Sequence, residues 1–326
     1  MRLGFFTDTH ARQDTPEGRN DSFPVSLYKK LEECGQIFRD QEVDTVLFGG
    51  DLFHTPDPGN KVIYNMSGIL KSWQKQIIGV IGSHDYFGYQ IKTLDRTALG
   101  ILTKADILEL VGTYATPVPG VKPFIDLSYE TDRCTTNVVI CGTPHTYWLA
   151  DDPAYFSEPR HVENKIQIQL VHGDLVHKPV PWKHITIDQI KTESDIVLSG
   201  HVHPGWNKPL QYGDTVFFNP GSIARLENSG TKRVPRVIII DTDETTIAKR
   251  FKSIYLTSCE KHPFKDKVTE EVVAQDTTRL LELIKSTAGI QKIDVKAKLI
   301  AIGQEIKSPE HVVEAAALCI DEAEAL

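Results

Sequence analysis

The chain has 326 residues and a formal net charge of −8, which argues against a protein that coats nucleic acid but allows an enzyme that meets it at a local patch. No apolar run approaches the roughly 20 residues of a membrane helix, and the apolar run at the N-terminus is too short for a signal peptide. The five scattered cysteines fit neither a disulfide framework nor a cysteine-type zinc site, so we expect a reducing, cytoplasmic compartment and no membrane partner.

Short apolar runs alternate with amphipathic stretches in the first third of the chain. Residues 2–6, 44–48 and 76–81 are rich in β-branched and aromatic types, as strands buried on both faces are. Residues 24–41 and 60–76 lie between them, and in the first of these stretches apolar residues recur at helical spacing. This strand–helix–strand order continues to about residue 110 and predicts βαβ units in an α/β fold.

The pattern changes in the second half of the chain. Residues 137–142, 168–171 and 195–200 again have the composition of buried strands. Residues 211–221 and 233–256 alternate like hairpin strands, which predicts a second sheet that is antiparallel in part. From residue 264 to residue 326 the pattern indicates a small α/β appendage.

Five of the predicted strands end in aspartate or histidine. The side chains that follow them are Asp8 and His10, Asp51 and His54, His84 and Asp85, His172, and His201 and His203. Ligands of open α/β sheets bind at the carboxyl ends of the strands, so these side chains converge if the strands share one sheet. Mixed nitrogen and oxygen donors suit divalent transition metals, whereas calcium favours all-oxygen sites.

The number and spacing of these donors predict two metal ions. The Asp8-x-His10 and His201-x-His203 pairs can each point one way from an extended chain. The donors exceed the three or four that one zinc ion takes. Two ions bridged by a carboxylate are typical of phosphatases and nucleases, and Asp51 is the expected bridge because it follows a central strand.

The order D-x-H, GGD, G-S-HD, HGD and GHVH over residues 8–203, with FFNPGS at 217–222, resembles the calcineurin-like metallophosphoesterase superfamily. Within it, GGDLFHTPDP is similar to DNA double-strand-break repair nucleases of the SbcD and meiotic-recombination type, and the short chain looks like their phage versions. The resemblance implies a four-layer α-β-β-α sandwich of two mixed sheets over residues 1–263. It also implies that residues 264–326 form a small α/β capping domain.

The resemblance further implies a role for each motif residue. The implied metal ligands are Asp8, His10 and His203 for one ion, and His172 and His201 for the other, with Asp51 between the two. His84 would approach the scissile phosphate and stabilise or protonate the leaving group. His54 matches a histidine that such nucleases need for exonuclease activity. Such nucleases are typically manganese-dependent, although Mg²⁺, Zn²⁺ and Fe²⁺ stay open here. The implied partners are DNA and an SMC-like ATPase subunit of the SbcC type, and a homodimer is a further alternative.

Ser83 stands where the family pattern has asparagine, and its hydroxyl is a shorter and weaker ligand than an amide oxygen. Water could fill the gap to the second metal, that metal could bind more weakly, or the protein could be an inactive scaffold. We favour the first two, because every other ligand type is intact. For Asp85 two roles are open, namely orienting His84 or capping the following turn.

Three functions therefore compete. The first is a DNA exonuclease and endonuclease subunit for double-strand-break repair or recombination. A phosphatase or cyclic-nucleotide phosphodiesterase could use the same scaffold, and a weakly active scaffold subunit is the third. Tyr147, Trp148 and Trp182 could stack on bases, although packing is the more common role for such residues. His145 follows a strand end and is the one further histidine that we keep as a candidate.

Overall fold

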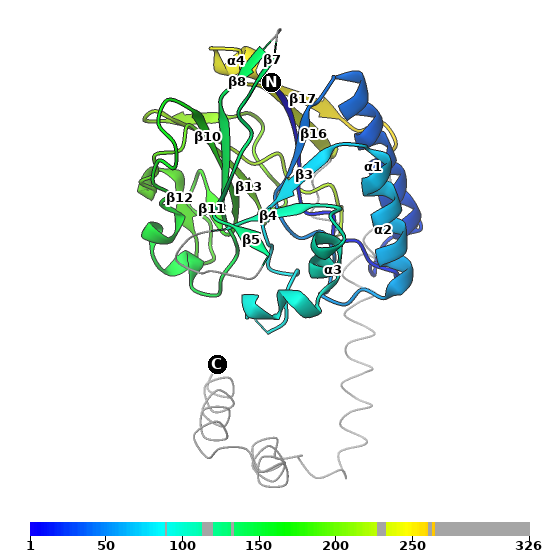
Figure 1. Cartoon of the computed structure of the whole chain (residues 1–326). Coiled ribbons are helices and arrows are strands. Elements are labelled where there is room, and N and C mark those ends of the chain that lie inside the picture. The colour runs from blue at the N-terminus through cyan, green and yellow to red at the C-terminus, as the bar shows by residue number, and fades with distance from the viewer. Residues whose placement is uncertain (89, 113–119, 132–133, 227–232, 260–262, 265–326) are drawn as a thin grey trace, which may run out of the picture. The chain divides into compact units, whose positions relative to one another are not determined.

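The computed structural model describes residues 1–88, 90–112, 120–131, 134–226, 233–259 and 263–264. Two mixed sheets with helices make up this part of the chain (Figure 1), which confirms the expected α/β sandwich. The capping domain expected at 264–326 lies outside the described residues except for Phe264, and it stays a prediction. Among the described residues, no helix has the length and apolar character that crossing a membrane requires.

The first sheet has seven strands in the order β17-β16-β1-β2-β3-β4-β5. They are β1 (Arg2–Phe6), β2 (Thr45–Phe48), β3 (Gln76–Gly79), β4 (Glu109–Val111), β5 (Val121–Lys122), β16 (Arg236–Asp241) and β17 (Phe251–Tyr255). The expectation that residues 233–256 belong to the second sheet is wrong. β16 pairs antiparallel with β1, from Arg2 opposite Asp241 to Phe5 opposite Ile238, so the late hairpin extends the first sheet.

The second sheet has six strands in the order β14-β15-β13-β10-β9-β6. They are β6 (Phe124–Asp126), β9 (Val138–Thr143), β10 (Ile166–His172), β13 (Ile196–Gly200), β14 (Leu210–Tyr212) and β15 (Thr215–Phe218). The four central strands are parallel, and β6 and β14 pair antiparallel at the edges. Two small ribbons complete the described strands, β7 (Tyr129–Thr131) with β8 (Cys134–Thr136) and β11 (Leu175–Val176) with β12 (Ile185–Thr186).

Helices cover the outer face of the first sheet. The helices on this face are α1 (Phe23–Asp40), α2 (Asn60–Ser72) and α3 (Ala98–Lys104), whereas the single turn α4 (Ile247–Arg250) connects β16 to β17. Proline in the first turn of α1 suits a helix start, where its missing N–H is not needed. Figure 1 shows α1 and α2 side by side, and their apolar side chains share one core with β1 and β2.

The outer face of the second sheet is covered differently. Its described layer contains the 3₁₀ helices η2 (Leu149–Asp151), η3 (Pro153–Phe156) and η4 (Ile187–Gln189), while η1 (Ile91–Arg96) lies before α3. Leu149, Phe156 and Ile187 pack onto Val171 and Val197 of the sheet. Prolines recur in the connections before and after β10, at positions 144, 153, 159, 179 and 181. Because proline disrupts helix interiors, the described residues of these connections form 3₁₀ turns and no α-helix.

The central core lies between the two sheets. Apolar side chains of β1 and β2 there share one buried cluster with those of β9, β10 and β13. At one edge the two sheets lie so close together that a Cβ atom added to Gly200 would be only 2.4 Å from the carbonyl oxygen of Gly49. Only glycine fits at such a position. This approach brings the carboxyl ends of strands from both sheets together.

Candidate metal centre

The structure gathers all ten predicted site residues at this edge of the sandwich. They follow β1 (Asp8, His10), β2 (Asp51, His54), β3 (Ser83, His84, Asp85), β10 (His172 at its end) and β13 (His201, His203). We expected convergence if the strands shared one sheet, whereas β1, β2 and β3 belong to the first sheet and β10 and β13 to the second. Convergence arises because the two sheets end together.

Asp8, His10 and His203 form a first group of donors. Their ligand atoms all lie within 4.8 Å of one another. His10 Nε2 lies 2.9 Å from His203 Nε2, and Asp8 Oδ1 lies 3.9 Å and 3.7 Å from these two nitrogens. Asp8 is held in turn by the hydroxyl of Thr7 and the backbone N–H of His201, which donate to its carboxylate.

Asp51, His172 and His201 form a second group. His172 Nδ1 donates to the carbonyl of Gly49 at 2.7 Å, so its Nε2 is the nitrogen that faces the site. That Nε2 lies 3.2 Å from Asp51 Oδ2 and 3.2 Å from His201 Nδ1. Asp51 Oδ2 also lies 3.6 Å from His10 Nε2 of the first group. One carboxylate oxygen therefore contacts both groups, as a bridging ligand would.

The backbone at these residues is left-handed. Asp8, His10, Asp51 and His201 have φ values of 54°, 46°, 57° and 75°, which is uncommon for residues other than glycine. Such conformations cost roughly 1–3 kcal/mol each and cluster at functional sites. Hydrogen bonds from Asp8 N to the Gly50 carbonyl and from His10 N to the Asp51 carbonyl, both 3.0 Å, hold the two loops in register.

Asp85 contacts the backbone of Asp51 and is fully buried. Its carboxylate accepts from the backbone N–H groups of Gly82, Asp51 and Leu52, at 2.8, 2.9 and 3.1 Å. No hydrogen bond in the described part of the chain joins it to the His84 ring. These contacts match neither expected role, because all three N–H donors precede Asp85 in the sequence, and they make Asp85 a positioning residue for Asp51.

Asp85→Ala is expected to destabilise the fold by at least about 3 kcal/mol. Three buried N–H donors would lose their acceptor, and each such loss costs about 1–3 kcal/mol. Urea denaturation in the presence of a chelator measures this without a contribution from metal. Asp85→Asn keeps one oxygen acceptor and should lose less, and an alanine variant as stable as the parent would contradict the assigned role.

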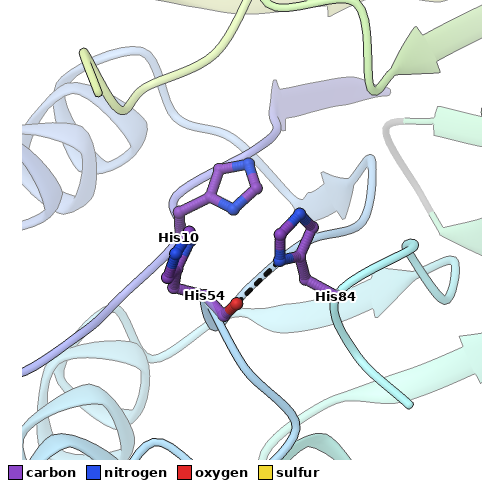
Figure 2. Close-up of side chains that lie close together, drawn as sticks. All are labelled: His10, His54 and His84. Carbon is purple, nitrogen blue, oxygen red and sulfur yellow. Dashed lines mark hydrogen bonds between the residues drawn. The ribbon is translucent and has the colours of Figure 1, made fainter. Parts of the chain in front are cut away.

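His10 of the first group lies close to two further histidines, His54 and His84 (Figure 2). His84 Nδ1 donates to the backbone carbonyl of His54 at 2.7 Å, and the two rings stack with centroids 5.1 Å apart. The His84 ring also meets the edge of the His10 ring at 4.8 Å. Burial and the nearby Arg12 cation lower the pKa of His54 to about 4, so His54 is neutral at pH 7.

Carboxylates dominate the electrostatics of the second group. Burial opposes charge on His172, yet the carboxylate of Asp51 outweighs it and raises the pKa of the imidazole to about 10. Burial likewise opposes charge on Asp51, but His172 and His10 hold its pKa well below the ordinary value. The cluster therefore keeps an anionic carboxylate at its centre, where a cation is favoured.

The donor set fits divalent metals. Two pairs of imidazole nitrogens face each other at 2.9 Å and 3.2 Å, and a cation can accept lone pairs from both members of such a pair. Buried His10 Nδ1 has no hydrogen-bond partner among the described residues. Nitrogen and carboxylate oxygen together are the donors that Mn²⁺, Fe²⁺ and Zn²⁺ accept.

Ser83 lies at the rim of the second group. It is half-buried, and its hydroxyl donates to Asp51 Oδ2 at 3.2 Å. The hydroxyl thus contacts the carboxylate of Asp51, the expected bridge.

Ser83→Asn is expected to tighten the second metal site roughly tenfold, the scale at which changes around metal ligands act. An amide oxygen reaches further than a hydroxyl and is a better ligand. Calorimetric titration with Mn²⁺ measures the affinity of both sites, with Ser67→Asn on α2 as the matched control. Unchanged affinity at both sites would exclude a coordinating role for position 83.

The structure adds Asp174, which the sequence did not select, and brings His145 close to the site. Asp174 Oδ2 lies 3.4 Å from His201 Nε2, and its other oxygen accepts from Trp182 Nε1 at 3.1 Å. The HGD motif contained the signal for Asp174. His145, kept as a further candidate, places its ring 5.4 Å from that of His201. Burial, together with the histidines around it, lowers the pKa of His145 to about 3.

Comparisons with known proteins place the chain among phosphoesterases. Residues 1–205 match the model of the calcineurin-like phosphoesterase family. The double-strand break repair protein mus-23 of Neurospora crassa is 33% identical over 82 residues, 24% of this chain and 10% of that protein. This chain thus spans about a tenth of the curated relative that it matches.

Solved structures give similar but distant matches. The calcineurin-like phosphoesterase YfkN from Bacillus subtilis matches with 12% identity and a TM-score of 0.47, over 87% of this chain and 98% of that one. A putative 5′-nucleotidase from Staphylococcus aureus matches with 16% identity and a TM-score of 0.46, over 82% and 55%. Since the family model covers more than half of the residues, this chain belongs to the calcineurin-like phosphoesterase family, whose members are hydrolases with a divalent metal site.

Proposed function

We propose that the chain is a metal-dependent DNA exonuclease and endonuclease subunit that acts in double-strand-break repair or recombination. The observation that carries the proposal is the bridged pair of donor groups with His84 beside it. The match to a double-strand break repair protein supports DNA as the substrate. An SMC-like ATPase partner and a cytoplasmic location belong to the same proposal and rest on the resemblance of GGDLFHTPDP to such nucleases.

Each donor group has a proposed task. Asp8, His10 and His203 would hold one ion, His172 and His201 the other, and Asp51 would bridge them. The two cations would supply Lewis-acid activation of a water molecule and would neutralise charge on the phosphate. We propose Mn²⁺ as the working ion.

His84 has the task of a general acid. Its Nδ1–H donates to the His54 carbonyl, so Nε2 is the nitrogen that exchanges a proton with the leaving oxygen of the phosphodiester. The hydrogen bond fixes the tautomer and the ring orientation. Because the acceptor is a main-chain carbonyl, this hydrogen bond does not depend on the His54 side chain.

A phosphatase or cyclic-nucleotide phosphodiesterase is the second candidate. The formal net charge of −8 favours it, because a small phosphate ester requires no extended basic surface, whereas a long polyanion is repelled by an acidic protein.

Hydrolysis of linear duplex and single-stranded DNA with Mn²⁺ tests the proposal. Activity should appear with Mn²⁺, disappear with a chelator and return when Mn²⁺ is restored. A phosphomonoester, a cyclic nucleotide and bis(p-nitrophenyl) phosphate are assayed in parallel. Hydrolysis of the monoester or the cyclic nucleotide without cleavage of DNA would favour the second candidate. Inactivity on every substrate with every divalent metal would leave the scaffold role.

A further inference from the structure

A pocket beside the metal centre has no role in the chemistry described above. Its cavity volume is about 550 Å³, and it is lined in part by Tyr86, Ile91, His145, Tyr147, Trp148 and Tyr155. This size is typical of pockets that hold one small organic group. We propose that the pocket binds an unpaired nucleobase of the DNA substrate, a proposal that rests on the nuclease function above.

The pocket adjoins the donor groups through His145. The His145 ring lies 5.4 Å from the His201 ring and 6.2 Å from the His172 ring. The Tyr86 hydroxyl contacts His145 Nδ1 at 2.8 Å and donates to its carbonyl at 3.1 Å, so this wall is fixed. A nucleotide whose phosphate lies at the donor groups could therefore place a neighbouring base in the pocket.

Three of the aromatic side chains that line the pocket are exposed to an unusual degree. Tyr147, Trp148 and Tyr155 are 58%, 62% and 52% exposed. They come from one short segment around η2 and η3, and the Tyr147 and Trp148 rings meet edge to face at 4.6 Å. Adjacent exposed aromatic faces are typical of surfaces that bind single strands, since every base can stack on them.

The charge around the pocket suits a polyanion. The chain carries a net charge of −8, yet none of the described residues that line this pocket is acidic, and Lys92 is among them. Asp151, close to Trp148 in sequence, is paired with Lys183. A phosphate backbone can thus approach here, whereas a purely apolar ligand would gain nothing from Lys92.

The proposed subsite has a consequence for the choice of substrate. Bases inside a duplex are already paired and stacked, so they must be freed before they can enter a pocket. Single strands and frayed ends present free bases at no such cost. We therefore infer a preference for unpaired nucleotides next to the scissile bond.

Binding of fluorescently labelled oligonucleotides without metal tests the subsite apart from catalysis. Anisotropy compares an oligothymidylate with an abasic oligomer of the same length. The oligothymidylate should bind more tightly, and Trp148→Ala should weaken it roughly tenfold with little effect on the abasic oligomer. Tyr155→Ala should act in the same direction. The matched control is Tyr64→Ala on α2, which removes a ring that is 73% exposed and lies outside the pocket.

Each outcome decides between the proposals. Mn²⁺ binding by Trp148→Ala should equal that of the parent, because Trp148 belongs to none of the donor groups. Equal binding of the base-bearing and abasic oligomers, or an equal loss in Tyr64→Ala, would overturn the subsite and leave the nuclease proposal standing. Base-dependent binding in a protein that cleaves no DNA would overturn the nuclease proposal instead.

Discussion

His84→Gln is expected to slow phosphodiester hydrolysis by about 10²- to 10⁴-fold, the range for loss of a general acid or base, and to leave metal binding intact. Glutamine keeps the side chain polar and of similar length but cannot exchange a proton with the leaving oxygen. His84 lies outside the group of Asp8, His10 and His203 and the group of Asp51, His172 and His201, so we expect both groups to keep their metals, although His84 forms a third candidate metal-binding group with His10 and His54. Steady-state cleavage of linear DNA and metal analysis after gel filtration measure the two effects.

The matched control for His84→Gln is His177→Gln. His177 is exposed, its ring packs beside Trp206, and it belongs to none of the candidate metal groups. This control should cleave at the parent rate. A His84→Gln variant with full activity would remove His84 from the mechanism, and loss of metal from that variant would make it a ligand.

Asp51→Asn is expected to lower hydrolysis by at least about 10²-fold, the scale of losing one preorganised electrostatic partner, and to reduce the metal bound per chain. The amide has the size of the carboxylate, and asparagine tolerates the left-handed backbone at this position. The loss would therefore reflect the missing charge, because Asp51 Oδ2 is the atom that contacts nitrogens of both groups.

Metal content after dialysis, calorimetry and cleavage rates check the Asp51→Asn prediction. Asp57→Asn lies in the same GGDLFHTPDP segment, is exposed, and should bind metal and cleave as the parent does. Thermal unfolding of both variants with a chelator shows whether the fold is retained. Retention of two tightly bound ions by Asp51→Asn would contradict a bridging role.

The positions of the donors could be predicted because they depend on local sequence. An apolar run followed by Asp8 or His172 marks the carboxyl end of a buried strand, and such ends meet where ligands bind. The division into two sheets was harder to predict. β16 pairs with β1 and not with a strand of the second sheet. This choice depends on long-range packing, and the alternation of apolar and polar residues along one segment does not determine it.

The parts of the site that the sequence did not reveal depend on tertiary contacts. Asp85 and His84 are neighbours, which made orientation of the ring a reasonable alternative. The fold instead turns Asp85 toward three backbone N–H groups of other residues. Trp148 was a candidate for base stacking whereas Tyr155 was not selected, and only the three-dimensional arrangement places the two in one pocket.

The left-handed turns at Asp8, His10, Asp51 and His201 bear on how the protein acquires its ions. A chain would not adopt four such conformations at once unless the surrounding sheets imposed them. Folding alone therefore places the metal-binding residues in position. Binding of the metal ions should then require little rearrangement of the backbone and incur little entropic penalty. Chelation should then strip the ions while the protein stays folded, and the emptied protein should reload rapidly without a refolding step.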